Sequence, residues 1–251
     1  MNESDEVFSI NYKKSLQYWA DIPPTVDGVL GGFGFISNAD IEGSELFLNS
    51  LLSSDNPPAT NTALDCGAGI GRITKQLLLP HFDLVDVVEP DEKFINSIKE
   101  HVGELSSKLG TLHKVGLQEF IPVRKYDVIW NQWVLGYLKD EDLEAYLIRC
   151  RDSLSASGII IVKENVTSSG KIEKDSTDSS VTRTFKQYIR IFKKCNLKRI
   201  KQCKQANFPN GIYPVYMFAL VPNHKELERS MTKANGALNN DCIIVQNKME
   251  L

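Results

Sequence analysis

The chain has little cysteine and histidine and no long apolar run. Its five cysteines are odd in number, widely spread and without a Cys-x-x-Cys pair, which argues against a disulfide framework or a zinc knuckle and predicts buried free thiols. The four histidines are not at metal-ligand spacing from one another, so we expect no metal site. No apolar run approaches the ~20 residues of a membrane helix. The acidic start, residues 1–6, is unlike a basic targeting peptide.

A strong net charge is also lacking. The 29 basic and 32 acidic residues leave a formal charge of −3, which gives no general attraction to nucleic acid or anionic membranes. One segment departs from this balance, since residues 183–204 hold nine bases and no acid. Because Phe185, Tyr188 and Phe192 follow helical spacing there, we interpret the lysines as the solvent face of a packed helix. The alternative is phosphate binding.

Short apolar runs alternate with amphipathic ones from residue 62 onward. Strands are expected at 62–66, 84–89, 111–115, 126–131, 158–164, 197–204 and 213–220, and helices at 9–20, 41–54, 71–79, 91–108, 140–154 and 182–195. This alternation predicts an α/β fold with a doubly wound, mostly parallel sheet. Two polar or Gly/Pro-rich stretches, 23–34 and 167–181, are expected to be loops. We divide the single structural domain into N-terminal helices with a Gly/Pro-rich loop (1–55), a core (56–221) and a tail (222–251).

The sharpest local feature is a glycine-rich turn between a strand and a helix. Glycines at 67, 69 and 71 follow Asp65, whereas a nicotinamide fold needs the spacing Gly-x-Gly-x-x-Gly. Glycine lets the backbone turn sharply and come close to a ligand at the strand end. The carboxylate of Asp65 suits the ammonium and sulfonium of S-adenosylmethionine, and the spacing therefore favours this cofactor, through Gly67 and Gly69, over an ordinary tight turn.

Further positions fit the same cofactor. Glu89 ends the second strand, where a carboxylate accepts hydrogen bonds from both ribose hydroxyls; otherwise it is a solvated strand end. Leu117 and Gln118 follow the third strand, where they would flank an adenine, and Gln132 follows the fourth. Arg72 is placed to pair either with the cofactor carboxylate or with a neighbouring acid.

Four further stretches of the chain are distinctive: residues 18–32, 64–75, 126–138 and 178–183. They resemble the protein N-terminal methyltransferase family, which modifies the α-amine of proteins that begin Xaa-Pro-Lys or Xaa-Pro-Arg after Met removal. The resemblance runs from about residue 10 to residue 220 and implies a seven-stranded class I methyltransferase sheet with an N-terminal helical extension. It places cofactor contacts on Gly67, Arg72, Glu89, Leu117, Gln118 and Gln132. It places peptide contacts on Trp19, Leu30, Trp133, Asn165, Asp175, Asp178, Ser180 and Tyr213.

The chain departs from the family at one position. Family members carry a histidine after the glycine of the third stretch, as part of the proton-handling machinery, and this chain has Tyr137. A phenol of pKa about 10 is a poor base at neutral pH, but it can hold a water or a carboxylate. We therefore take Asp178 as the candidate base and Tyr137 as its catalytic partner. The plainer interpretation of Asp178 is a helix cap or a loop acid.

The peptide-binding roles also have plainer alternatives. Trp19 and Trp133 would wall the peptide channel, although tryptophans commonly belong to the core. Asp175 would pair with the basic third residue of the substrate, or it is a solvated loop acid.

The resemblance also carries expectations about partners and location. We expect protein substrates with Xaa-Pro-Lys/Arg termini, ribosomal proteins among them, and a monomeric enzyme of the cytoplasm and also the nucleus. We expect no membrane or nucleic-acid partner. A nucleic-acid methyltransferase and a small-molecule methyltransferase are the alternatives.

Overall fold

The computed structural model describes residues 9–223. Its helices are α1 (Tyr12–Asp21), α2 (Val26–Val29), α3 (Ser37–Leu52), α4 (Leu79–His81), α5 (Glu92–Val102), α6 (Asp140–Asp152) and α7 (Phe185–Lys194). Shorter helical segments are η1 (Gly34–Ile36), the π-helix η2 (Thr74–Leu78), η3 (Gly103–Lys108) and η4 (Leu135–Tyr137). The strands are β1 (Thr62–Cys66), β2 (Leu84–Val88), β3 (Leu109–His113), β4 (Tyr126–Gln132), β5 (Leu154–Asn165), β6 (Glu173–Asp175), β7 (Ser180–Thr182), β8 (Leu197–Lys204) and β9 (Val215–Pro222).

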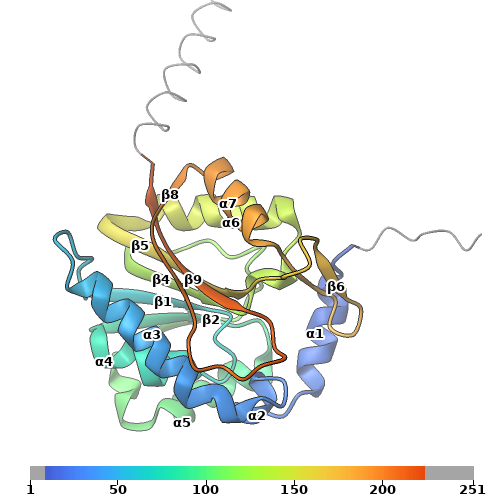
Figure 1. The fold of residues 1–251 in the computed structure, drawn as a ribbon. Helices are drawn as coiled ribbons and strands as arrows, with labels where there is room; N and C mark the ends of the chain where they lie inside the picture. The colour runs from blue at the N-terminus through green and yellow to red at the C-terminus, as the bar shows by residue number, and fades with distance from the viewer. Residues whose placement is uncertain (1–8, 224–251) are drawn as a thin grey trace, which may run out of the picture.

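Seven strands form one sheet in the order β3-β2-β1-β4-β5-β9-β8 (Figure 1). The first five are parallel, and β9 is antiparallel to both β5 and β8. The expected doubly wound, mostly parallel sheet is thus confirmed, and each of the seven expected strands is present. The order reverses at β1, which lies between β2 and β4, and in sheets of this kind ligands bind outside the carboxyl ends at that point.

Successive residues of each strand point to opposite faces of the sheet and build two apolar layers. Leu64 and Ile129 belong to the cluster covered by α6 and α7, whereas Ala63 and Val128 belong to the cluster covered by α3, η2 and α5. Figure 1 shows these two groups of helices on opposite sides of the sheet. Because both faces are covered, the central strands are buried along almost their whole length.

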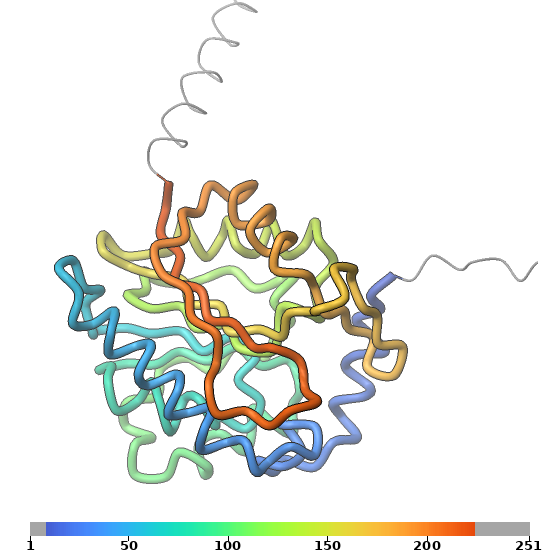
Figure 2. Tube along the Cα trace, viewed as in Figure 1, coloured from blue at the N-terminus to red at the C-terminus, as the bar shows by residue number. Residues whose placement is uncertain are grey.

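The two stretches expected to be loops both contain regular structure. The Gly/Pro-rich stretch holds α2, whose first turn is capped by the Thr25 side chain accepting from Gly28 N at 3.0 Å. The polar stretch 167–181 forms the hairpin of β6 and β7 (residues 173–182). Figure 2 shows this hairpin next to the start of α1, where Asn11 N donates to Ser179 Oγ at 2.8 Å. Tertiary contact therefore orders a segment whose composition predicted a loop.

Three cysteines, at positions 66, 150 and 195, are buried free thiols as expected, but Cys203 is exposed on the edge strand β8, and Cys242 lies outside the described residues. In residues 9–223 no helix has the length and apolar character to cross a membrane, and no group of three or more acidic, histidine or cysteine side chains is placed to bind a metal. The division of the domain into three parts stays a prediction, and most of its tail lies beyond the described residues.

Candidate active site

The glycine turn follows β1 and has a backbone that only glycine adopts readily. Gly67, Gly69 and Gly71 have φ values of 69°, 56° and 81°. A Cβ added to Gly67 would lie 2.4 Å from Val134 Cγ2, so that side chain would have to move. The turn therefore presents bare backbone above the carboxyl ends of the central strands.

A cavity of about 420 Å³ opens beside this turn. All seven residues expected to bind the cofactor line it: Gly67, Gly69, Arg72, Glu89, Leu117, Gln118 and Gln132. Parallel strands put these residues together because each lies at or after the carboxyl end of β1, β2, β3 or β4, with Gln132 as the last residue of β4. The cavity volume lies within the roughly 300–1,000 Å³ typical of small-molecule sites.

Two buried carboxyl groups lie at the cavity. Glu89 accepts from Gly69 N at 2.8 Å and from Asp91 N at 2.9 Å, and burial raises its pKa to about 7. Asp65 accepts from Thr74 Oγ1 at 2.5 Å, and burial raises its pKa to about 6. Hydroxyl or cationic groups of a ligand would relieve the cost of ionising them there.

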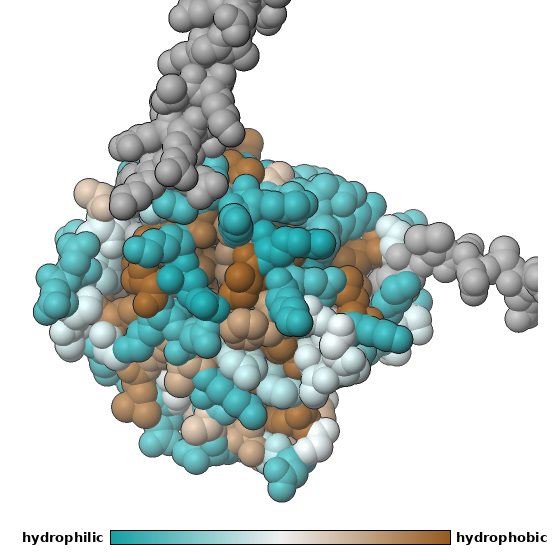
Figure 3. Space-filling model, turned by 45° about the horizontal axis from the view of Figure 1, so that its top comes forward, coloured by the Kyte–Doolittle hydropathy of each residue, from teal (hydrophilic) through white to brown (hydrophobic). Residues whose placement is uncertain are grey.

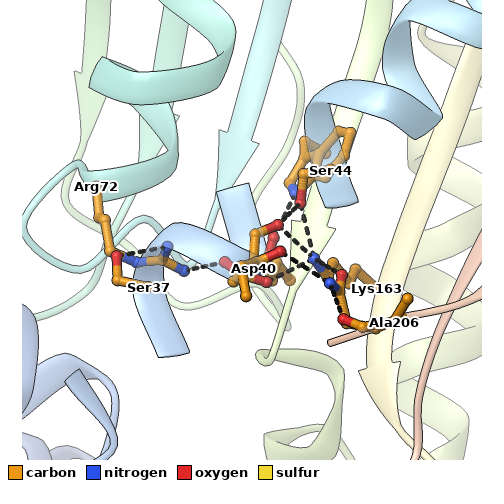
Figure 4. Close-up of polar contacts among 10 residues, drawn as sticks. Ser37, Asp40, Ser44, Arg72, Lys163 and Ala206 are labelled. Carbon is orange, nitrogen blue, oxygen red and sulfur yellow. Dashed lines mark hydrogen bonds and ion pairs between the residues drawn. The ribbon is translucent and has the colours of Figure 1, made fainter. Parts of the chain in front are cut away.

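Behind the cavity lies a buried charged network that we did not expect from the sequence (Figure 4). Asp40, from α3, pairs with Arg72 at 2.7 Å and with Lys163 at 2.5 Å, and it accepts from Gln132 Nε2 at 2.9 Å. From the sequence, Arg72 was expected to pair either with the cofactor carboxylate or with a neighbouring acid. The structure shows the second of these, with Asp40 as the acid. The guanidinium still reaches the cavity wall, 5.9 Å from the ring centroid of Trp133.

Four of the residues expected on the peptide side also line the cavity: Trp19, Leu30, Trp133 and Tyr137. The rings of Trp19 and Tyr137 meet edge to face, with 6.0 Å between centroids. Trp133 has a left-handed φ of 51°, and within residues 9–223 its buried Nε1 has no hydrogen-bond partner. An unpaired buried donor at a cavity wall is available to a bound molecule.

The other expected peptide contacts lie outside the cavity lining. Asp178 is joined to it by Tyr137, whose hydroxyl donates to Asp178 Oδ2 at 2.6 Å, while Ser180 N donates to Oδ1 at 3.0 Å. Burial and the adjacent Asp178 carboxylate raise the pKa of Tyr137 well above its ordinary value. Asp175 is exposed at the end of β6, where it accepts from Thr177 N, and Asn165 ends β5. The structure thus connects Asp178 and Ser180 to the cavity and does not bring Asp175 or Asn165 into its wall.

Tyr213 lies on the loop between β8 and β9, 39% exposed, and its hydroxyl donates to Glu173 of the hairpin. It therefore contacts the acid-bearing hairpin and not the cavity wall.

Helix α1 forms one wall of the cavity and is held at both ends. Its Tyr12 hydroxyl donates to Asp142 of α6. At its other end, Lys93 Nζ donates to the carbonyl of Ala20 at 2.8 Å and to that of Ile22. A basic group favours the carbonyl end of a helix. Trp19 is in this way fixed over the cavity.

Two buried ionisable side chains, to which the sequence assigned no role, hold the turn 133–138. Glu164 accepts from Val134 N at 2.8 Å and Leu135 N at 2.7 Å. Arg183 donates to Leu135 O at 2.7 Å and Leu138 O at 2.5 Å. Glu164 lies at the end of an expected strand, and Arg183 begins the basic segment 183–204. Charged residues are common in both settings, so no sequence pattern distinguished these two.

Comparison with solved structures supports the same fold. A SAM-dependent methyltransferase of Leishmania major superposes with a TM-score of 0.78 at 35% identity, covering 83% of this chain and 82% of that one. A glycopeptide N-methyltransferase complexed with S-adenosyl-L-methionine shares the fold at a TM-score of 0.60 and 13% identity, covering 73% of this chain and 94% of that one. The sheet order, the glycine turn and the cavity define a class I methyltransferase whose cofactor is S-adenosylmethionine.

Two similar proteins have names that specify which group they methylate. Alpha N-terminal protein methyltransferase 1 of Drosophila melanogaster is 44% identical over 218 residues, which are 86% of this chain and 78% of that protein. N-terminal Xaa-Pro-Lys N-methyltransferase 1 of Homo sapiens is 47% identical over 211 residues, 83% of this chain and 94% of that protein. Residues 8–221 match the family described as AdoMet dependent proline di-methyltransferase, and the chain belongs to this family.

The residues present fit S-adenosylmethionine. The bare glycine turn leaves room that a Cβ would fill, and the carboxyl groups of Asp65 and Glu89 suit a ligand with cationic and hydroxyl groups. The guanidinium of Arg72 offers a partner for a carboxylate.

Proposed function

We propose that the enzyme methylates the free α-amine of proteins that begin Xaa-Pro-Lys or Xaa-Pro-Arg. The names of its relatives support this substrate class. The observation that carries it is the bond from Tyr137, in the cavity wall, to Asp178 on the hairpin. This bond sets an acid next to the cavity, whose wall also holds the aromatic rings of Trp19 and Trp133. A cationic chain terminus is the ligand that such an acid would attract.

The cofactor would be held by the residues that line its cavity. Glu89 would accept from the ribose hydroxyls, Leu117 and Gln118 would flank the adenine, and Arg72 with Gln132 would face the amino-acid end. The backbone of Gly67 and Gly69 would pass close to the bound molecule. When bound, S-adenosylmethionine supplies an electrophilic methyl group on a positively charged sulfur.

The enzyme must present a neutral amine to that methyl group. An α-amine titrates near pH ~8, so roughly a tenth of it is neutral at pH 7. A lysine amine at ~10.4 is disadvantaged by about 3.4 kcal/mol relative to it. In this proposal Asp178 accepts a hydrogen bond from the amine and takes its proton, while the Tyr137 hydroxyl keeps the carboxylate in place. A modest base is sufficient because orientation supplies much of the rate.

The rest of the peptide would be recognised by its shape and charge. Leu30, 8% exposed in the cavity wall, would contact the substrate proline together with the indoles of Trp19 and Trp133. Asp175 would pair with the basic third residue, and Asn165, Ser180 and Tyr213 would hydrogen-bond the substrate chain. The hairpin carries Asp175 and Ser180, and it contacts both the start of α1 and Tyr213 of the β8–β9 loop. These contacts support a single binding surface for the peptide.

The two alternative functions are methylation of nucleic acid and methylation of a small molecule. Helix α7 buries Tyr188, Ile191 and Phe192 and exposes its basic residues, and Figure 3 shows hydrophilic side chains over the side of α6 and α7. This arrangement favours a solvent face over a nucleic-acid site, for which we would expect binding that weakens steeply with salt. A small-molecule enzyme would ignore peptides.

The decisive experiment offers the purified enzyme labelled S-adenosylmethionine and an Xaa-Pro-Lys peptide. Mass spectrometry should place the label on the terminal nitrogen, and an N-acetylated copy of the peptide should stay unlabelled. Equal labelling of the acetylated copy would overturn the proposal.

We further propose that the enzyme acts as a monomer, which sedimentation tests. We propose that it is present in the cytoplasm and the nucleus, which cell fractionation tests. We also propose that ribosomal proteins are among its substrates, which is tested by comparing N-terminal methylation in cells with and without the enzyme.

A further inference from the structure

Asp40 is a fully buried carboxylate behind the cavity, not part of its wall. Its oxygens receive Arg72 Nη2 at 2.7 Å and Lys163 Nζ at 2.5 Å, and Gln132 Nε2 lies 2.9 Å from each of them. Figure 4 shows Asp40 between Arg72 and Lys163. Two of these three partners, Arg72 and Gln132, are themselves part of the cavity wall.

The orientation of Arg72 depends mainly on Asp40. Its other polar contact in the described part of the chain is a 3.5 Å approach to Ser37 Oγ, at the limit of a hydrogen bond. Gln132 has a second contact, since its Oε1 accepts from Trp130 Nε1 at 3.0 Å. With Oε1 occupied in this way, the amide nitrogen of Gln132 is aimed at Asp40. One carboxylate thus sets the direction of two side chains that come from different elements.

The charges in the network do not cancel. Lys163 is engaged on all sides, because its Nζ also donates to Asp40 O at 2.9 Å, Ser44 Oγ at 2.8 Å and Gln205 Oε1 at 2.8 Å. One anion therefore serves two cations. Lys163 is not part of the cavity wall, whereas the guanidinium of Arg72 is, and there it favours an anionic group on the ligand.

We propose that Asp40 is a positioning residue that aims Arg72 and Gln132 at the carboxylate of the cofactor's amino-acid end. The proposal rests on the role that we assign to Arg72 in cofactor binding. It does not depend on which amine the enzyme methylates, so binding without any peptide tests it separately from the proposed function.

Calorimetric Kd values for two ligands distinguish a positioning role of Asp40 from a general loss of structure around the cavity. S-adenosylhomocysteine carries the amino-acid end, whereas 5′-methylthioadenosine keeps the adenosine and sulfur and lacks that end. In Asp40→Asn the Kd for S-adenosylhomocysteine should rise about 10- to 150-fold, the range for a lost hydrogen bond to a charged group. The Kd for 5′-methylthioadenosine should change less than about threefold, because this probe lacks the amino-acid end that Arg72 and Gln132 are proposed to hold.

Two further variants keep the test decisive. Asp40→Asn leaves two buried cations without a counter-charge, so Asp40→Asn/Lys163→Met, which removes one of them, should show the same selective loss if the single variant does not fold. Asp86→Asn is the matched control: Asp86 is 1% exposed, pairs with Arg124 at 2.9 Å and lies outside the cavity wall. It should lower stability and leave the ratio of the two Kd values unchanged. Equal weakening of both probes, or of neither, in the Asp40 variants would overturn the proposal.

Discussion

Replacing Tyr137 by phenylalanine removes the hydroxyl that joins the cavity to Asp178. The lost bond is 2.6 Å long and ends on a carboxylate, a kind of bond worth about 1.5–3 kcal/mol. If the full bond serves the reaction, kcat/KM for an Xaa-Pro-Lys peptide should fall roughly 10- to 150-fold. The affinity for S-adenosylhomocysteine should stay unchanged, because Tyr137 is assigned to the peptide side.

The pH profile gives a second measure of the same residue. Because the pKa of Tyr137 lies well above its ordinary value, the phenol stays protonated through the assay range. With S-adenosylmethionine saturating, so that the ionisation of Glu89 does not affect the rate, the rate should therefore rise with pH up to about 8 as the substrate amine loses its proton, without a second ionisation near 6.5. Tyr137→His should introduce that second ionisation, since histidine titrates there.

Tyr146→Phe is the matched control for this substitution. Tyr146 is fully buried, its hydroxyl donates to Asn131 Oδ1 at 2.7 Å, and it lies outside the cavity wall. The variant should lose stability and keep its kcat/KM. If Tyr137→Phe keeps kcat/KM within about twofold of the parent enzyme, or if Tyr146→Phe loses as much, the hydroxyl of Tyr137 has only a packing role.

Three further substitutions test other parts of the site. Asp178→Asn should reduce turnover strongly and leave S-adenosylhomocysteine affinity nearly unchanged; full activity would remove Asp178 from the mechanism. Since the folded pKa of Glu89, about 7, exceeds its ordinary value, its contribution to folding is present at low pH and lost as pH rises through about 7. In the proposed site its ionised form would accept the ribose hydrogen bonds, so cofactor affinity should rise over the same range, and Glu89→Gln should abolish this rise in calorimetry. Arg183→Met should lower the free energy of unfolding by about 3 kcal/mol in urea denaturation, because it leaves the carbonyls of Leu135 and Leu138 without their buried donor; an unchanged midpoint would contradict this.

The sheet and the cofactor side of the site could be predicted because their signals are local. Apolar runs a few residues long marked the strands, and β1 and β8 begin and end at the predicted residues. Residues that follow parallel strands meet at one edge of the sheet, so the positions of Glu89 and Gln132 along the chain were sufficient to assign both to one site.

Predictions were wrong for segments whose order depends on distant contacts. The stretch 167–181 has the composition of a loop, and only its pairing with residues at the start of α1 and with Thr184 makes it a hairpin with a buried Ser179. In the Gly/Pro-rich stretch, Asp27 Oδ1 accepts from Gly34 N at 2.9 Å. This bond ties α2 to the glycine-containing segment that follows it. Neither contact has a period or a spacing that a sequence displays.

By itself the sequence determined the order of strands and helices, the glycine turn and a set of residues that line the cavity, because each follows from a pattern a few residues long. Only the tertiary structure decided that Asp40 and Lys163 are buried and paired, and that Tyr137 meets Asp178. A charged side chain looks the same in a sequence whether it faces water or an opposite charge. Its partner is set by how α3, β4, β5 and the hairpin pack together.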